Sequence, residues 1–204
     1  MANVNDVAAA IVEQCGQGIT TMRLEKLAYY CQAWHLASTQ HPLFSAEIQA
    51  FRDGPVVHEL FAQHKGRRVV DQWNGNAAAL SEAAGSTVRA VVAALADFEG
   101  DDLSALTHTE QPWLDARGGL APEAQGNRAI EHASIQRFFG DKFRPGADLE
   151  FQVWTYAESQ RALNDPAHLE WLDRVEALGQ DDDLSAVGDF QPFEEFMQEC
   201  RALA

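Results

Sequence analysis

The sequence has too few cysteines, in the wrong arrangement, for a disulfide scaffold or a structural zinc site. Its 204 residues include only Cys15, Cys31 and Cys200, and no two of them stand in a CxxC spacing. Long apolar runs are also missing, since no stretch approaches the roughly 18 apolar residues of a membrane span. The N-terminal MANVNDVAAA lacks the basic segment and apolar run of a signal peptide. These absences predict a cytoplasmic protein.

The sequence also has few basic residues. The chain has 15 basic residues against 31 acidic ones, which gives a formal net charge of −16. This balance disfavours direct binding to a nucleic-acid backbone, which depends on clustered Lys and Arg. It also disfavours attachment to an anionic membrane surface. A basic protein partner remains compatible with it.

The signatures of common catalytic sites are absent. GxSxG, GxGxxG and the Walker A motif do not occur. His58-Glu59 begins like the HExxH zinc motif, but Ala62 occupies the fifth position. The next histidine, His64, would lie on the opposite side of a helix. Cys31 falls within an apolar helical stripe, where a thiol is inert. We therefore expect no catalytic residue.

Metal ligands are also predicted to be absent. Seven histidines are present, but His35 and His41 lack a carboxylate at ligand spacing. We interpret both as surface or packing residues. The sequence thus predicts neither a metal ion nor another cofactor.

Helical periodicity dominates what is present. Leu24, Leu27, Ala28, Cys31 and Trp34 form one wide apolar stripe, which indicates a deeply buried central helix. Capping residues and spacing predict helices over residues 5–15, 21–38, 56–65, 86–98 and 132–139, with a turn or short helix over 101–109 and loops over 66–76 and 117–127.

The β content is expected to be small. Residues 48–52 have the pattern of a short strand, and Asp53-Gly54-Pro55 after it indicates a sharp turn. A second β element is predicted around residues 149–156, because FQVWTY has strand composition. The expected fold is mainly α, a single globular helical domain with a small β element and an acidic C-terminal extension.

The last third of the chain differs in charge. Residues 141–204 contain 15 acidic and 5 basic residues, and so carry −10 of the net −16. Aromatic residues continue through this segment, which predicts that it is folded or folds on a partner. Two interpretations stay open for these aromatics: they complete the core, or they form a partner interface.

Three segments resemble a known family. They are residues 19–36 (ITTMRLEKLAYYCQAWHL), 51–61 (FRDGPVVHELF) and 106–113 (LTHTEQPW). In this order and spacing they resemble the Panacea domain, also called SocA-like and seen in phage-associated GepA-type proteins. The resemblance covers about residues 4–140, and residues 141–204 resemble no family. We therefore expect a Panacea-like domain over 4–140 and an extension over 141–204.

This resemblance implies binding without catalysis. Panacea-domain proteins are antitoxins of bacterial and phage toxin–antitoxin pairs, and one branch delivers its toxin to a protease. The implied partner is a cognate protein toxin encoded by the adjacent gene, neutralised by direct contact. Alternatives are a proteolytic adaptor, an acidic nucleic-acid mimic, and a hydrolase with an unrecognised site. A homo-oligomer stays open. The sequence departs from the family pattern at Glu25, where Gln is usual, and at Arg52-Asp53.

The candidate residues fall into two groups. A structural role is expected for the motif residues Leu24, Leu27, Tyr30, Trp34, Gly54, Pro55, Thr107, His108, Pro112 and Trp113. A partner-binding role is expected for Lys26, Gln32, Trp154, Tyr156, Trp171, Phe193 and Phe196. For Lys26, pairing with an acidic group is the alternative.

Overall fold

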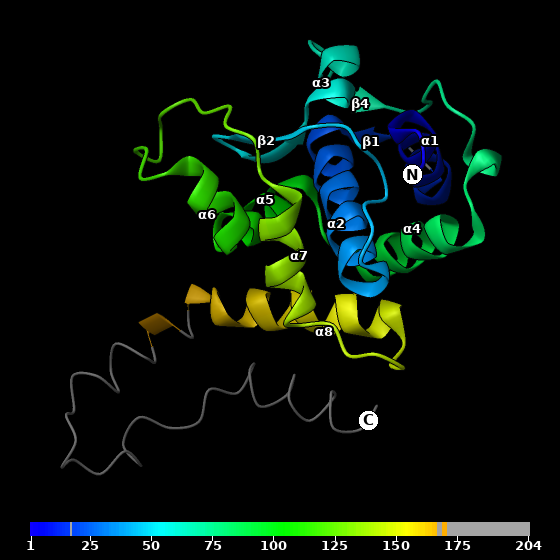
Figure 1. The fold of residues 1–204 in the computed structure, drawn as a ribbon. Helices are drawn as coiled ribbons and strands as arrows, with labels where there is room; N and C mark the ends of the chain where they lie inside the picture. Colours follow the sequence, from blue (N-terminus) through cyan, green and yellow to red (C-terminus); the bar gives the residue numbers. More distant parts are fainter. Residues whose placement is uncertain (17, 167–168, 171–204) are drawn as a thin grey trace. The chain divides into compact units, whose positions relative to one another are not determined.

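The computed structural model describes residues 1–16, 18–166, 169 and 170 (Figure 1). The chain divides after Val153 into two units, residues 1–153 and residues 154–204. The predicted contact residues Trp171, Phe193 and Phe196 lie outside the described residues.

The described fold is mainly α, as predicted, with small two-stranded sheets. The elements are α1 (Val4–Cys15), β1 (Ile19–Thr20), α2 (Thr21–Thr39), β2 (Ile48–Phe51), β3 (Gly54–Val57), α3 (His58–His64), β4 (Val69–Val70), the 3-10 helix η1 (Ala77–Ala79), α4 (Glu82–Ala94), α5 (Gly100–His108), α6 (Gln111–Arg117), α7 (His132–Gly140) and α8 (Leu149–Leu163). None of the helices in the described ranges has the length and apolar character that crossing a membrane requires.

Helix α2 lies at the centre of the first unit (Figure 1). Thr20 begins it, because its hydroxyl oxygen accepts a hydrogen bond from the backbone N–H of Arg23 at 3.1 Å. Every residue from Leu24 to Ala37 is buried, so the predicted stripe extends around the whole helix. Helices α1, α4, α5 and α7 pack around it. The central buried helix is therefore confirmed.

An aromatic cluster joins α7 to α2. The Phe139 ring lies edge-on to Tyr29 and Tyr30, each with 6.2 Å between ring centroids, and to Trp34 with 5.5 Å. Phe139 and Trp34 are both fully buried. Edge-to-face pairs at these separations add to the burial of apolar area. This cluster forms the aromatic part of the core.

The predicted strand near residue 48 is confirmed, and it has a partner. Strands β2 and β3 form an antiparallel hairpin with Ile48 opposite Val57 and Phe51 opposite Gly54. The prediction of a helix from Val56 is wrong at its start, because the Gly54–Val57 segment pairs with β2 and is buried throughout. Helix α3 begins only at His58.

The second predicted β element is wrong. Leu149–Leu163 forms helix α8, and the side chain of Asp148 accepts a hydrogen bond from the backbone N–H of Phe151 at 2.8 Å. This N-terminal cap outweighs the strand composition of FQVWTY. Helix α4 likewise begins earlier than predicted, because Ser81 caps it by accepting from the backbone N–H of Ala84.

The connection between α3 and α4, residues 65–81, is attached to α1 through Asn5. The Oδ1 atom of Asn5 accepts hydrogen bonds from Trp73 Nε1 at 3.0 Å and from Gln63 Nε2 at 2.7 Å. Its Nδ2 donates to Glu59 Oε1 at 2.9 Å. A Cβ atom on Gly75 would lie 2.1 Å from the backbone oxygen of Asn5, so the chain passes closest to α1 at this glycine. We call this connection the strap.

Candidate functional site

The three motif segments meet at the turn of the β2–β3 hairpin. Helix α2 and helix α5 both contact β3, and α6 contacts β2. We call the residues that hold this junction the motif cluster; they are Glu25, Lys26, Tyr29, Tyr30, Gly54, Pro55, Ser104, Thr107, His108, Glu110 and Trp113.

Gly54 allows the hairpin to approach α2 and α5 closely. Its φ of +98° lies in the region that favours glycine. A Cβ atom at this position would lie 2.6 Å from Thr107 Oγ1 and 2.7 Å from Lys26 Cε. Both the backbone conformation and the available space therefore require glycine here.

Lys26 carries its ammonium group into the interior. The residue is 1% exposed, and its Nζ donates a hydrogen bond to the backbone oxygen of Pro55 at 3.1 Å. Burial lowers the pKa of Lys26 to about 8, although the charges of Glu25 and Asp53 act in the opposite direction. The side chain fixes β3 to α2 at the cost of a buried cation.

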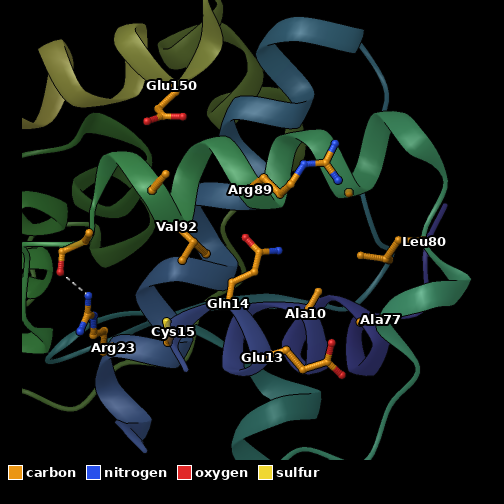
Figure 2. A pocket seen from close by; sticks show the side chains of 13 residues that line it. Ala10, Glu13, Gln14, Cys15, Arg23, Ala77, Leu80, Arg89, Val92 and Glu150 are labelled. Atoms are coloured by element: carbon orange, nitrogen blue, oxygen red, sulfur yellow. Dashed lines mark hydrogen bonds between the residues drawn. The ribbon is translucent and has the colours of Figure 1, made fainter. Parts of the chain in front are cut away.

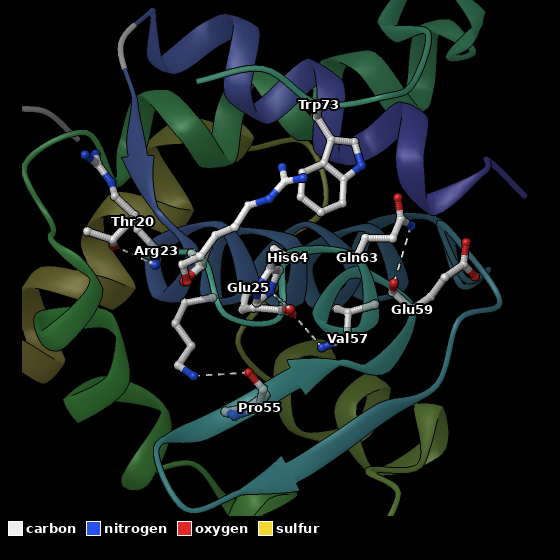
Figure 3. A network of polar contacts seen from close by, with 12 residues as sticks. Thr20, Arg23, Glu25, Pro55, Val57, Glu59, Gln63, His64 and Trp73 are labelled. Atoms are coloured by element: carbon white, nitrogen blue, oxygen red, sulfur yellow. Dashed lines mark hydrogen bonds and ion pairs between the residues drawn. The ribbon is translucent and has the colours of Figure 1, made fainter. Parts of the chain in front are cut away.

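Glu25 fastens the other end of β3, together with α3 (Figure 3). Its Oε2 accepts a hydrogen bond from the backbone N–H of Val57 at 2.7 Å, and its Oε1 lies 2.6 Å from His64 Nε2. The side chains of Glu25 and His64 are 3% and 6% exposed. Burial raises the pKa of the Glu25 carboxyl, while the contacts with His64 and Val57 oppose that rise. Glu25 thus fixes both β3 and α3 to α2.

Helices α5 and α6 also hold the hairpin. Ser104 Oγ donates to the backbone oxygen of Asp53 at 2.9 Å, and Trp113 Nε1 donates to that of Phe51 at 3.0 Å. His108 stacks on Trp113 with 4.3 Å between ring centroids. The turn is therefore fixed through its backbone, which leaves Arg52 and Asp53 exposed as a salt-bridged pair.

Glu110 connects the third motif segment to α2. The hydroxyl groups of Tyr29 and Tyr30 each donate to its carboxylate at 2.8 Å, and the residue is fully buried. Hydrogen bonds to a buried carboxylate are strong because the surroundings have a low dielectric constant. The sequence reasoning assigned no role to Glu110, although it stands inside the segment LTHTEQPW.

The expected structural residues lie in or beside this core. Leu24, Leu27, Tyr30, Trp34, Gly54, Pro55, Thr107, Pro112 and Trp113 are buried, and His108 is partly buried. Burial lowers the pKa of His108, and the charge of Lys26 lowers it further.

The expected contact residues are placed differently. Gln32 is fully buried: its Oε1 accepts from the backbone N–H groups of Leu43 and Phe44, and its Nε2 donates to the Phe44 oxygen. Lys26 is equally enclosed, and both side chains bind groups of their own chain. The partner-binding role of Lys26 and Gln32 stays a prediction. Trp154 and Tyr156 lie on α8 in the second unit. Their partner-binding role stays a prediction.

A hollow that the sequence did not indicate lies between α1, η1 and α4 (Figure 2). Its volume is about 650 Å³, and Cys15 and Arg23 line one end. Arg23 donates to the backbone oxygen of Ala96 at 2.6 Å and pairs with Glu99 at 3.5 Å. Burial raises the pKa of the Cys15 thiol. This guanidinium therefore holds the end of α4, and the thiol is a poor nucleophile.

No grouping in the described part of the chain resembles a catalytic centre. Burial raises the pKa of Cys31, which is fully enclosed in α2. His58 is exposed, whereas His64 points inward to Glu25. Among the described residues, no three or more His, Cys, Asp or Glu side chains are grouped so that they could hold a metal ion.

The comparison with protein families gives one match. Residues 24–114 match the family model described as "Antitoxin SocA-like, Panacea domain". This range is shorter than the predicted 4–140 but includes the second and third motif segments and the first from Leu24 onward. No curated protein and no solved structure is a significant match. The hairpin junction is thus the meeting point of the matched segments, and residues 24–114 are similar to the SocA-like Panacea antitoxin domain.

Proposed function

We propose that this chain is the antitoxin of a toxin–antitoxin pair and that it neutralises a cognate protein toxin by direct contact. The observation that carries the proposal is the family match over residues 24–114. The motif cluster supports it, because the matched segments are used to build a scaffold rather than to line a reactive cleft. The protein needs no catalysis of its own in this role.

The proposal includes a division of labour. Residues 4–140 supply the scaffold, and residues 141–204 select the toxin. Charge supports this division, since the last third carries −10 of the net −16. An acidic surface attracts a basic toxin and accelerates their encounter. The aromatic residues Trp154 and Tyr156 are of the type that dominates interface energies.

Co-expression tests the function. The toxin is expected to be encoded by the adjacent reading frame, and its expression alone should stop growth of the host. Co-expression of this chain should restore growth, and the two proteins should purify as a complex. Restored growth in a host without its cytoplasmic proteases supports direct contact, whereas rescue that requires a protease identifies an adaptor. A chain that neither rescues growth nor binds the toxin contradicts the proposal.

Truncation and exchange test the division of labour. A chain ending at Gly140 should stay folded and lose neutralisation. Grafting residues 141–204 onto a related Panacea scaffold should transfer neutralisation of the cognate toxin. Charge reversal of acidic residues in this segment should slow association more than it lowers stability. A folded 1–140 chain that neutralises the toxin fully would refute the division while leaving the antitoxin function intact.

A further inference from the structure

The hollow between α1, η1 and α4 combines an apolar floor with unpaired acidic groups. It has a volume of about 650 Å³ (Figure 2). A hollow of this size is large enough to hold several side chains of a bound segment. None of the residues that line it belongs to the motif cluster, so the construction of the hairpin junction does not account for it.

Small side chains form most of the floor of this hollow. Ala93, near the end of α4, and Ala96, just beyond it, are exposed, and Gly85 lies nearer the start of the same helix. Ala10 contributes from α1, and Val92 adds a branched apolar side chain. Because most of these side chains are short, a neighbouring helix can come close to both α1 and α4. The floor therefore suits an apolar segment that packs on it.

The two arginines that line the hollow are already bound by the chain. Arg23 donates to the backbone oxygen of Ala96 at 2.6 Å and pairs with Glu99 at 3.5 Å. Arg89 pairs with Glu82 at 2.9 Å. Each guanidinium therefore lies beside a carboxylate that offsets its charge.

The acidic groups of the hollow are unpaired. Glu13 of α1 and Glu150 of α8 are exposed, and neither makes a hydrogen bond or an ion pair in the part of the chain that the structure describes. The side chain of Gln14 extends from α1 toward α4 (Figure 2). An ionised carboxylate only accepts hydrogen bonds, and the ammonium and guanidinium groups of Lys and Arg donate them. The hollow therefore complements a segment that is apolar on one face and basic on the other.

We propose that this hollow binds a basic amphipathic helix of the cognate toxin, an inference that rests on the proposed antitoxin function. The apolar face of the helix packs on Ala10 and Ala93, and its Lys or Arg side chains meet Glu13 and Glu150. Grooves between helices are a common binding place for amphipathic helices. Glu150 belongs to the proposed toxin-selecting segment and the other lining residues to the scaffold, so both parts contribute to one contact.

A designed peptide tests the hollow without the toxin. The probe is an amphipathic helix of about 18 residues, or five turns, with Lys on one face and Leu and Ala on the other. Its control peptide has Glu in place of each Lys and should not bind the full chain. Cys15 lines the hollow and reports where the probe binds. At ten times its Kd the Lys peptide should slow alkylation of Cys15 by N-ethylmaleimide about tenfold, because only the free chain reacts.

Filling the hollow should abolish this binding. Ala93→Trp places a large ring in the hollow from an exposed position of α4. Ala62→Trp is the matched control, since Ala62 is exposed on α3 and lies outside the hollow. Affinity for the Lys peptide should fall at least about tenfold in Ala93→Trp, because the ring occupies the volume that the peptide needs, and should not change in Ala62→Trp.

Charge removal provides a second pair of variants that leaves the shape of the hollow intact. Glu13→Gln with Glu150→Gln removes its unpaired charges, whereas Asp71→Asn with Glu123→Gln removes two exposed charges outside it. The first pair should weaken peptide binding about three- to tenfold and reduce its dependence on salt, and the second should weaken it less than about twofold. Equal losses in the two pairs, or a Cys15 that the peptide does not protect, overturn the proposal.

The protein of the adjacent reading frame then separates this inference from the proposed function. Ala93→Trp and the first charge pair should weaken neutralisation of that toxin in parallel with peptide binding. Full neutralisation by these variants overturns docking in the hollow and leaves the antitoxin function intact. Peptide binding in the hollow of a chain that neutralises no toxin overturns the toxin as the occupant together with the proposed function.

Discussion

The motif cluster holds the β2–β3 hairpin against α2, and the strap is held against α1. The two regions differ in how deeply their hydrogen bonds are buried. In the motif cluster, Glu25, Lys26 and Glu110 are 0–3% exposed and bind backbone or hydroxyl groups that are also buried. In the strap, Trp73 binds Asn5 of α1 near the surface, where Asn5 also binds Gln63 and Glu59 of α3. The types of bond are similar, but the free-energy cost of losing them differs.

Burial is the reason for this difference. A group that loses its partner at the surface binds water instead, whereas a buried group is left without a partner. The buried residues of the motif cluster lie in or beside the three sequence segments that resemble a family. The strap is held by scattered contacts that no pattern in the sequence distinguishes. They are the Asn5–Trp73 bond, the bond from the backbone N–H of Asn76 to Asp6, and the β1–β4 pair.

The largest loss of stability is expected for Glu25→Ala, and Glu59→Ala is its matched control. Glu25→Ala leaves the N–H of Val57 and the His64 ring unpaired in the interior, and should lower the free energy of unfolding by about 3–5 kcal/mol. Glu59→Ala removes an exposed carboxylate that binds Asn5, and should have a much smaller effect. Denaturant unfolding of both variants measures the difference. Equal losses would contradict the role given to burial.

The next largest loss of stability is expected for Gly54→Ala, and Gly66→Ala is its matched control. Gly54→Ala combines an unfavourable φ of +98° with contacts below 3 Å, and should cost about 2–4 kcal/mol. Gly66→Ala shares the positive φ, at +86°, but a Cβ there meets nothing within 4 Å. It should cost about 1–2 kcal/mol. The difference between the two midpoints of unfolding isolates the steric contribution at Gly54. Equal midpoints would contradict the close approach of the hairpin to α2 and α5.

Lys26→Met should change how stability depends on pH. The pKa of Lys26 is about 8 in the folded chain and 10.5 for an ordinary lysine, so its charge costs about 3 kcal/mol at neutral pH. This cost is fully present below pH 8 and disappears as the pH rises to 10.5, because the folded chain binds fewer protons in that window. Wild type should therefore gain stability relative to Lys26→Met between pH 8 and 10.5. If the free energies of unfolding of wild type and Lys26→Met changed in parallel with pH, the buried charge of Lys26 would be contradicted.

The smallest expected effect belongs to the strap. Asn5→Ala removes the hydrogen bonds to Trp73, Gln63 and Glu59, all of which can bind water instead. The free energy of unfolding should fall by about 1 kcal/mol. Hydrogen exchange in residues 65–81 should accelerate while α2 stays protected. Loss of protection in both regions would show that the strap also supports the core.

Apolar periodicity and turn composition predicted the fold correctly where the tertiary packing favoured the same local structure. The apolar stripe of α2 and the Asp53-Gly54-Pro55 turn were both visible in the sequence. The β1–β4 pair, Ile19 opposite Val70 and Thr20 opposite Val69, was not, because two-residue strands have no periodicity. At residues 149–156 strand composition was misleading, since the Asp148 cap favoured a helix.

The site was harder to predict than the fold. Lys26 and Gln32 were the polar residues of the central helix, and polarity usually marks an exposed face. Helix α2 is enclosed on all sides, so these groups bind Pro55, Leu43 and Phe44 instead. Such pairs join residues far apart in the chain, and a single sequence does not specify them.

Titration of a purified toxin with the purified chain, in a protease-free assay of toxin activity, tests the central claim most directly. Direct neutralisation predicts that inhibition increases linearly with added chain and is complete at a fixed stoichiometry set by the complex. The chain should remain bound to the inhibited toxin and should release active toxin on denaturation and refolding. Complete inhibition by a small fraction of that amount would indicate catalysis, and undiminished toxin activity in excess chain would contradict neutralisation by contact.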